Sequence, residues 1–358
     1  MMDDTAAAEP TARQRAAYTM FQMARASEWW AYKFAPILAT AYATASFLRV
    51  PLWPRLPRLL LLLLALTVGA TYVSLLNDWT DRADDAAAGK DNRLARQSGQ
   101  AVAAALAGCA GIGLTIGIYF WRVSPLAAGL YLGAWVAYSL YSLPPLRLKM
   151  RSIWGLLADT AGAHFFPQLL TATLVSHWVG VVPLGLWLAA VSAWALGCGL
   201  RNILWHQLGD AANDAQAGVN TFVVRWGQRA GRRLAVAALL LEAGGLLALL
   251  YLAQQPLAYL ALALYGGMTL LRARVWRQPL VIAQPQPGQH ILLNEYYEVY
   301  YPLALLLGQA LRYPADAGVL VLHSLLFGLH TWQRLRLWGA ALAVFGGKIR
   351  RLLHAEGA

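Results

Sequence analysis

The chain has 358 residues, of which 59% are hydrophobic and only 13% are charged, with a formal net charge of +12. A soluble globular domain carries about 25% charged residues, so this composition excludes an ordinary soluble protein. Residues 59–76, 100–121 and 123–146 contain no charged residue. Because each run is long enough to cross a hydrocarbon core of about 30 Å as a helix, the sequence predicts a polytopic membrane protein.

Apolar segments follow one another along most of the chain, and they predict an all-α bundle of membrane helices. We expect spans at about 34–50, 58–76, 100–121, 123–143, 152–175, 178–200, 232–253, 255–271 and 298–312, and residues 316–332 offer a tenth. We divide the chain into a cytoplasmic N-terminal tail (1–26), a transmembrane domain (27–332) and a basic C-terminal tail (333–358). The C-terminal tail is apolar in its middle and basic at both ends, which is typical of an interfacial amphipathic helix.

The basic residues indicate which side of the membrane the connections face. If the spans alternate, the long or charged connections 77–99, 144–151, 201–231 and 272–297 emerge on one side, together with the N-terminal tail. That side then collects most of the lysines and arginines, whereas the opposite face receives only Arg49, Arg55, Arg58 and Arg122 before the C-terminal region. The positive-inside rule therefore predicts cytoplasmic connections in a multi-pass protein, and we expect a bacterial-type inner or plasma membrane.

A first acidic cluster follows the apolar run that ends at Leu76. If the helix continues past the membrane, Asp78, Asp81 and Asp85 lie at i, i+3 and i+7 and share one face. Like charges on one face repel one another unless cations neutralise them, and carboxylate oxygens suit Mg²⁺ that also binds substrate phosphate. On this segment alone, a solvated acidic helix end remains the alternative.

A second acidic pair, Asp210 and Asp214, lies at i and i+4 on another helix that leaves the membrane on the same side. Two such clusters suggest the opposing walls of one metal–diphosphate site. Basic side chains that could complement phosphate are present on that side: Lys90, Arg93, Arg147, Lys149, Arg151 and Arg225. Each of them is also an ordinary positive-inside residue, and we select Lys90, Arg93, Lys149 and Arg225 as diphosphate-binding candidates.

Three segments together resemble the UbiA superfamily of intramembrane prenyltransferases. Residues 77–85 (NDWTDRADD) resemble its NDxxDxxxD motif, and residues 210–214 (DAAND), continued to 227, resemble its second DxxxD motif. Residues 141–149 (YSLPPLRLK) are similar to the connection between the family's fourth and fifth helices. The matches occur in the family's order and spacing over residues 30–275, which makes the joint signal specific.

The resemblance implies nine helices around a central cavity, and Mg²⁺-dependent transfer of a polyprenyl group from its diphosphate to an acceptor, most commonly an aromatic one. The motif positions imply metal–diphosphate binding by Asn77, Asp78, Asp81, Asp85, Asp210 and Asp214, with Arg93 and Lys149 neutralising the diphosphate. Many relatives carry a further acid where this chain has Gln207, beside His206, so a third ligand in the second cluster is in doubt. The expected partners are a prenyl diphosphate, a small-molecule acceptor and the lipid bilayer, and no nucleic acid.

Polar and aromatic residues near the motifs are candidates for the chemistry itself. Asp159 lies seven residues into the fifth span, where ionisable groups are costly and usually functional, so it is a candidate to orient or deprotonate the acceptor. Bonding to a neighbouring helix is an equal alternative, and His164 is a weaker candidate helper. Tyr138 and Tyr141 could stabilise an allylic cation, although packing is the commoner role of membrane aromatics. We place them, with Gln207 and His206, in an acceptor or prenyl pocket.

Three other functions are compatible with parts of this pattern. A UbiA-type terpene cyclase would begin with the same ionisation, and the motifs do not separate it from a transferase. A CDP-alcohol phosphotransferase requires a motif that residues 78–93 do not supply. A transporter would place acids near the membrane midplane and contain inverted repeats, whereas most acids here lie at one membrane edge.

Overall fold

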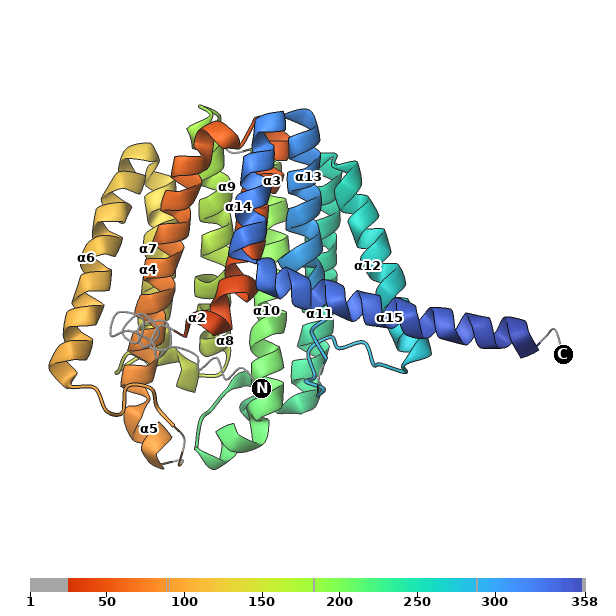
Figure 1. Cartoon of the computed structure of the whole chain (residues 1–358). Helices are drawn as coiled ribbons and strands as arrows, with labels where there is room; N and C mark the ends of the chain where they lie inside the picture. Colours follow the sequence, from red (N-terminus) through yellow and green to blue (C-terminus); the bar gives the residue numbers. More distant parts are fainter. Residues whose placement is uncertain (1–24, 88, 90, 183, 288, 356–358) are drawn as a thin grey trace, which may run out of the picture.

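The computed structural model describes residues 25–355 apart from 88, 90, 183 and 288, with backbone alone for 340, 341, 345 and 347–355. Across these residues the fold is all-α, as predicted, and its only β pairings are the single bridges Ser152–Thr221 and Val281–Ile291. The helices stand roughly side by side, apart from the last one, α15 (Figure 1).

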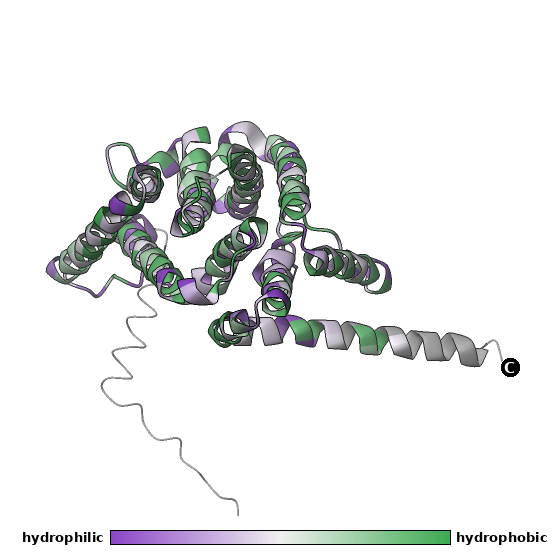
Figure 2. Ribbon diagram, turned by 90° about the horizontal axis from the view of Figure 1, so that it is seen from above, coloured by the Kyte–Doolittle hydropathy of each residue, from purple (hydrophilic) through white to green (hydrophobic). Residues whose placement is uncertain are grey.

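Five segments are long and apolar enough to cross a membrane. They are Trp53–Thr80 (η2, Trp53–Arg55, with α4, Leu56–Thr80), α6 (Gly99–Val123), α10 (Gly185–Gln216), α11 (Phe222–Ala253) and α12 (Pro256–Val275). Large apolar side chains on these helices face outward, among them Leu114, Trp121, Leu240 and Tyr251. Such an apolar exterior is stable against lipid chains, and green hydrophobic residues are spread over the helices in Figure 2.

The remaining helices of the bundle are shorter or interrupted. They are α2 (Ala26–Trp29), η1 (Trp30–Phe34), α3 (Ala35–Leu48), α7 (Pro125–Ser142), η3 (Leu148–Met150), α8 (Ile153–Thr160), η4 (Ala161–Phe165), α9 (Phe166–Trp178), η5 (Tyr296–Tyr300) and α13 (Tyr301–Arg312). Some of these pieces are parts of one longer helix that a π turn divides. Helices α2, η1 and α3 follow one another without a break, as do α8, η4 and α9.

The three π-helical turns η1, η4 and η5 each end two residues before a proline. These prolines are Pro36, Pro167 and Pro302, at the start of α3, α9 and α13. A proline has no N–H and its ring collides with the carbonyl four residues earlier, so the helix must widen or bend before it. The wider π turn accommodates this while the chain continues in a helix.

The tenth span that residues 316–332 offer is not formed. After η6 (Pro314–Asp316), helix α14 (Ala317–Leu326) has ten residues, which is about 15 Å and half the length needed to cross a membrane. The chain then turns at Phe327, and α15 (Gly328–Ala355) runs across the direction of the other helices and away from them (Figures 1 and 2). That orientation is the one expected of a helix lying at the membrane interface.

The connection expected between residues 201 and 231 is mostly helical. Helix α10 continues to Gln216, and α11 begins at Phe222, because the turn between them needs only a few residues around Gly218, whose φ is +69°. The two acidic motifs nevertheless lie at the same end of the bundle, where α4 continues into α5 (Arg82–Ala87) and α10 ends (Figure 1).

A fully buried ion pair holds the middle of α10 against α11. Arg201 donates hydrogen bonds of 2.6 Å to both carboxylate oxygens of Glu242, and neither side chain is exposed to solvent. Arg201 also donates to the carbonyl oxygens of Ile282 and Leu292, which fixes the connection after α12, and Tyr297 donates to Glu242. Both carboxylate oxygens of Glu242 are therefore hydrogen-bonded, and the Arg201 guanidinium balances their negative charge.

Candidate functional site

The first acidic cluster lies where α4 ends and α5 begins. Asp81 caps α4, with its N–H bonded to the carbonyl of Asn77, and Asp85 donates its N–H to the carbonyl of Asp81. The helical path thus continues almost unbroken past Asp78, as the i, i+3, i+7 spacing predicts. Asp78 is 7% exposed, and one of its carboxylate oxygens, Oδ2, has no hydrogen-bond partner among the described residues.

Two basic side chains from the connection between α7 and α8 point at this cluster. Arg147 donates to Asp81 at 2.8 Å and to Asp84 at 2.6 Å, and the Lys149 amine bonds both Asp81 and the side-chain oxygen of Asn77. Burial lowers the pKa of the Lys149 amine, while the neighbouring Asp81 charge opposes that shift. The Arg147 and Lys149 side chains therefore contact the aspartates directly, where they could also bind a further anion.

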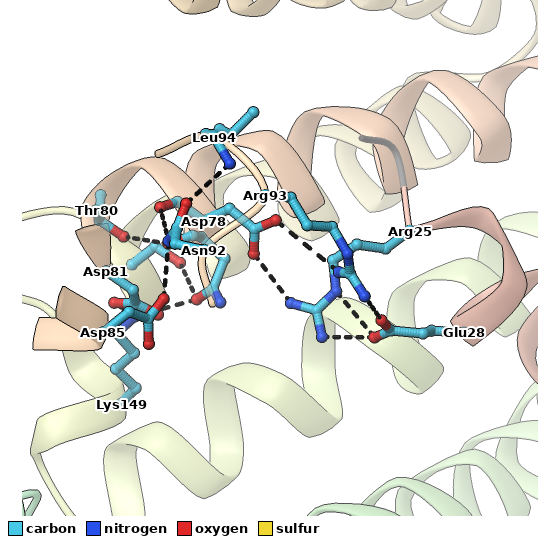
Figure 3. Close-up of polar contacts among 12 residues, drawn as sticks. Arg25, Glu28, Asp78, Thr80, Asp81, Asp85, Asn92, Arg93, Leu94 and Lys149 are labelled. Atoms are coloured by element: carbon cyan, nitrogen blue, oxygen red, sulfur yellow. Dashed lines mark hydrogen bonds and ion pairs between the residues drawn. The ribbon is translucent and has the colours of Figure 1, made fainter. Parts of the chain in front are cut away.

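A second set of charges closes the cluster from the side of the first helix (Figure 3). Arg25 donates to Asp78 at 3.1 Å, and Arg93 approaches the other oxygen of Asp78 at 4.0 Å. Glu28 joins the two arginines by accepting hydrogen bonds from both. Burial alone would raise the pKa of Glu28, but the bonds from Arg25 and Arg93 lower it. Sequence reasoning missed Arg25 and Glu28, because they lie far from the motif in the chain.

Asn92 was also missed, although it shapes the cluster. Its amide donates to the Asp78 carbonyl at 2.8 Å and to the Asp85 carboxylate at 2.7 Å, and its side-chain oxygen accepts the Leu94 N–H (Figure 3). The bond from the Leu94 N–H to the Asn92 side chain turns the chain after α5 back toward α4. The only feature of the sequence that could have pointed to Asn92 is its position directly before Arg93. Lys90, a diphosphate-binding candidate, lies outside the described residues.

The second acidic cluster lies near the end of α10. Asp210 is exposed and Asp214 is half-buried, whereas Gln207 is buried, with its side-chain oxygen 3.4 Å from the Val223 N–H at the start of α11. That contact joins the two helices, which is a structural use of the position where many relatives carry an acid. His206 is exposed and contacts the Trp205 ring.

The two clusters face a common region. The Ser152 N–H donates to the Asn220 carbonyl at 2.8 Å, so the connection that carries Lys149 is tied to the turn that follows Asp214. Tyr141 lies within electrostatic range of Asp81, Asp159 and Asp214, which come from three different helices or helix ends. Arg225 is exposed at the start of α11, where its guanidinium lies over the Trp226 ring, at 5.5 Å from the centroid.

An apolar cavity of about 150 Å³ lies inside the bundle, close to the first cluster. Ser74, one turn before Asp78, lines it, as does Trp29, next to Glu28. Its walls come from α2, η1, α3, α4, α7, η4 and α9, and its aromatic lining comprises Trp29, Phe34, Tyr131, Trp135 and Tyr138. The cavity therefore offers apolar and aromatic surface close to the charged side chains of Asp78, Asp81, Arg147 and Lys149, which form a charged mouth.

Asp159 comes from α8 and is half-buried near this cavity. It lies within electrostatic range of Lys33, Tyr138 and Tyr141, and the rings of the two tyrosines contact each other at 6.4 Å. The amine of Lys33, which sequence reasoning did not select, is hydrogen-bonded to the ring Nε2 of His164 at 2.7 Å. The structure thus brings Asp159, Tyr138 and Tyr141 into one neighbourhood.

The residues of the first cluster suit a divalent cation of the Mg²⁺ type. Within the described residues, no three histidine, cysteine, aspartate or glutamate side chains are grouped tightly enough to hold an ion in their present positions. The available ligands are carboxylate and amide oxygens, which Mg²⁺ prefers, and the Oδ2 of Asp78, which forms no hydrogen bond with the described residues and lies 4.0 Å from Arg93, could coordinate such an ion. Because the aspartates now bond to arginine and lysine, an incoming cation would have to compete with these partners, whereas a metal–diphosphate complex would satisfy both signs of charge.

Comparison with known proteins agrees with the geometry. A model of the UbiA prenyltransferase family matches residues 37–280. The fold is similar to solved structures of a UbiA homolog from Archaeoglobus fulgidus. The form bound to GPP and Mg²⁺ is 14% identical with a TM-score of 0.52, and the form bound to DMAPP and Mg²⁺ is 12% identical with a TM-score of 0.51; each match covers 84% of this chain and 99% of the other. No curated protein is similar enough to the chain to count as a match.

Proposed function

The chain belongs to the UbiA prenyltransferase family, and from that premise we propose that it is a Mg²⁺-dependent intramembrane prenyltransferase. It would move a polyprenyl group from its diphosphate to a small acceptor and release diphosphate. The observation that carries the proposal is the charged mouth, where Asp81 accepts from Arg147 and Lys149 and Asp78 accepts from Arg25, close to an apolar cavity with aromatic walls.

The diphosphate would bind at the mouth and the prenyl chain in the cavity. Asn77, Asp78, Asp81 and Asp85 would hold metal on one side, and Asp210 and Asp214 on the other; a bound Mg²⁺ supplies positive charge to the diphosphate oxygens. Lys149, Arg147 and Arg93 would then exchange part of their aspartate bonds for bonds to the leaving diphosphate. The apolar cavity would hold the hydrocarbon chain away from water.

In the reaction itself, the bond between carbon 1 of the prenyl chain and the diphosphate oxygen breaks, and its electrons leave with the diphosphate. A new bond forms between that carbon and the acceptor, which loses a proton. The negative charge that grows on the diphosphate is stabilised by the cations around Asp81, already held in place by their hydrogen bonds. Tyr138, which lines the cavity, and its neighbour Tyr141 would stabilise the allylic cation through their rings.

We assign the motif end of the bundle to the cytoplasm of a bacterial-type membrane, from the distribution of lysine and arginine. Cyclisation of the prenyl chain on itself would start from the same ionised state, so the test must separate the two outcomes.

The test uses the purified full chain in lipid nanodiscs with dimethylallyl, geranyl or farnesyl diphosphate, each with and without an acceptor and with and without Mg²⁺. We expect diphosphate release that needs Mg²⁺, together with a product whose mass is the sum of prenyl group and acceptor minus one proton. A hydrocarbon product formed without acceptor would instead indicate a cyclase. Diphosphate release equal in Asp81→Ala and the unsubstituted protein would contradict prenyl-diphosphate chemistry at this site.

A further inference from the structure

A separate cavity of about 420 Å³, here called the interfacial cavity, lies where α12 ends at the motif end of the bundle. It is enclosed by the last turns of α12, the connection that follows them and one turn of α15. Its polar lining includes Thr269, Arg272, Gln278, Gln289, His290 and Glu295, and it shares no lining residue with the apolar cavity. The end of α12 and the start of α15 lie at the same level of the bundle in Figure 1, and α15 extends outward from there in Figure 2. The interfacial cavity therefore lies where we expect the surface of the membrane.

Two arginines at the interfacial cavity carry N–H donors that are not used. Arg272 donates to Glu295 at 2.9 Å through Nη1, whereas its enclosed Nη2 has no hydrogen-bond partner among the described residues. Arg334, one turn before the lining residue Leu337, is 6% exposed and donates to the Nε2 of His290 at 2.5 Å. The Nε of Arg334 likewise has no partner in the described part of the chain. Leaving such donors unpaired costs free energy, which an anion in the cavity would recover.

The contact with Arg334 also decides the protonation of His290. Because a guanidinium can only donate, the Nε2 of His290 accepts, and the ring proton therefore lies on Nδ1. Burial and the Arg334 charge lower the pKa of His290 to about 4, so the ring is neutral at physiological pH. The histidine thus adds a further N–H donor to those of the two arginines.

The charge around the interfacial cavity is positive overall. Glu295 is the only acid among its described lining residues, and its two oxygens accept from Arg272 and from the Tyr300 hydroxyl. Glu298, the next acid in the chain, is bonded to a histidine of α15. Three exposed arginines flank the lining residues in the sequence: Arg274, Arg277 and Arg336. This excess of cations favours an anionic ligand.

The rim of the interfacial cavity is apolar, in contrast to its interior. Leu280 and Leu337 line it and are 50% and 48% exposed. Leu264 and Leu270 are more than half exposed on α12, and they continue the apolar surface along that helix toward the membrane interior. A free anion would leave this rim in water, whereas a ligand with an anionic head and apolar chains would cover it.

We propose that the interfacial cavity binds the phosphate head group of an anionic phospholipid from the membrane leaflet on the motif side. The phosphate accepts from the Arg272 Nη2, the Arg334 Nε and the His290 Nδ1. The glycerol lies at Leu280 and Leu337, and the acyl chains run along the outer face of α12. Basic pockets between membrane helices suit anionic lipid head groups. A bound lipid joins α12 to α15 and so holds α15 at the membrane surface.

The test uses the purified full chain in detergent, with dioctanoyl phosphatidylglycerol as the anionic lipid and dioctanoyl phosphatidylcholine as the zwitterionic one. Glycerol phosphate and inorganic phosphate represent soluble anions. Native mass spectrometry measures Kd for each, and thermal unfolding checks that each variant folds. Arg272→Gln and Arg334→Gln are compared with Arg336→Gln, which removes the same charge from an exposed position on α15. Arg334→Gln keeps the test valid if Arg272→Gln, which leaves Glu295 buried without its cation, does not fold.

We expect phosphatidylglycerol to bind more tightly than phosphatidylcholine, and its Kd to rise about tenfold or more in Arg272→Gln and Arg334→Gln, because each variant loses a charged donor to the phosphate. Arg336→Gln should raise that Kd less than about fivefold, since only a surface charge is lost. Equal affinity for the two lipids, or equal weakening in Arg334→Gln and Arg336→Gln, overturns the inference. Glycerol phosphate or inorganic phosphate binding as tightly as phosphatidylglycerol overturns it in favour of a soluble anion.

Discussion

The bonds around Asp81 allow the role of this carboxylate to be tested against a neighbour that shares its partner. Asp81 accepts from both Arg147 and Lys149, whereas Asp84 accepts from Arg147 alone. The Asp81 side chain is 21% exposed and that of Asp84 is 59% exposed. Replacing each aspartate by asparagine removes one negative charge at nearly constant volume, so the pair separates metal–diphosphate binding from general electrostatics.

The expected magnitudes follow from what each carboxylate does. Loss of one preorganised electrostatic group from a transition-state site typically costs about 2.7–4 kcal/mol, so Asp81→Asn should lower kcat/KM about 100-fold to 1,000-fold. An exposed ion pair contributes about 0–1 kcal/mol, so Asp84→Asn should lower kcat/KM less than about fivefold. Neither substitution should reduce the free energy of unfolding by more than about 1 kcal/mol, because both ion pairs of Asp81 are partly solvated.

The assay is diphosphate release from geranyl diphosphate over a range of Mg²⁺ concentrations, with circular dichroism melts on the same preparations. In Asp81→Asn the half-saturating Mg²⁺ concentration should also rise, since one hard oxygen ligand is lost. Equal losses in the two variants, or an Asp81→Asn enzyme that keeps more than a tenth of the activity, would show that the cluster acts as a solvated helix end and not as a ligand set.

Three further outcomes follow from other contacts. Replacing Asn92 by alanine removes donors to two aspartates of the first cluster, and it should raise the half-saturating Mg²⁺ concentration by about tenfold, measured by diphosphate release, with little change if the loop is merely solvated. Arg201→Met should lower the free energy of unfolding by about 3–5 kcal/mol, because it leaves Glu242 buried and uncompensated. Adding Glu242→Leu should recover much of that loss in denaturation experiments. A single variant more stable than the unsubstituted protein would refute the pairing argument. Gly162→Ala would bring a Cβ within 2.6 Å of the Tyr138 ring and push it into the apolar cavity, so kcat/KM for farnesyl diphosphate should fall more than that for dimethylallyl diphosphate; an equal change for both would refute it.

The first acidic motif illustrates how far the sequence reaches toward the site. The spacing of Asp78, Asp81 and Asp85 predicted one helical face, and the structure keeps a nearly continuous helical path through them. Helical periodicity is a local property, so it can be read from neighbouring residues. The sequence did not reveal Arg25 and Glu28, which reach this cluster from the first helix, because nothing in a local pattern records contacts across fifty residues.

Other differences come from the competition between local signals and packing. Residues 316–332 are apolar enough to suggest a span, but the helix there ends at Leu326, after about half the length needed to cross the membrane. Gln207 was placed in an acceptor or prenyl pocket with its role as a third ligand in doubt, and in the structure its side-chain oxygen contacts the start of α11. In both cases the side chain or segment has more than one favourable environment, and only the tertiary structure decides which one it occupies.

By itself the sequence determined that the chain is an all-α membrane protein, that its acidic motifs leave apolar helices on one side, and that these motifs resemble those of UbiA prenyltransferases. Composition and periodicity suffice for this, because the bilayer requires long apolar helices and repeats of 3.6 residues place motif side chains on one face. The tertiary structure alone decided that three π turns, distant in the chain, bring Lys33, His164 and Glu298 to one polar pocket beside the apolar cavity. The physical reason is that a proline can bend or widen its own helix locally, whereas the meeting of three such turns depends on how all the helices pack together.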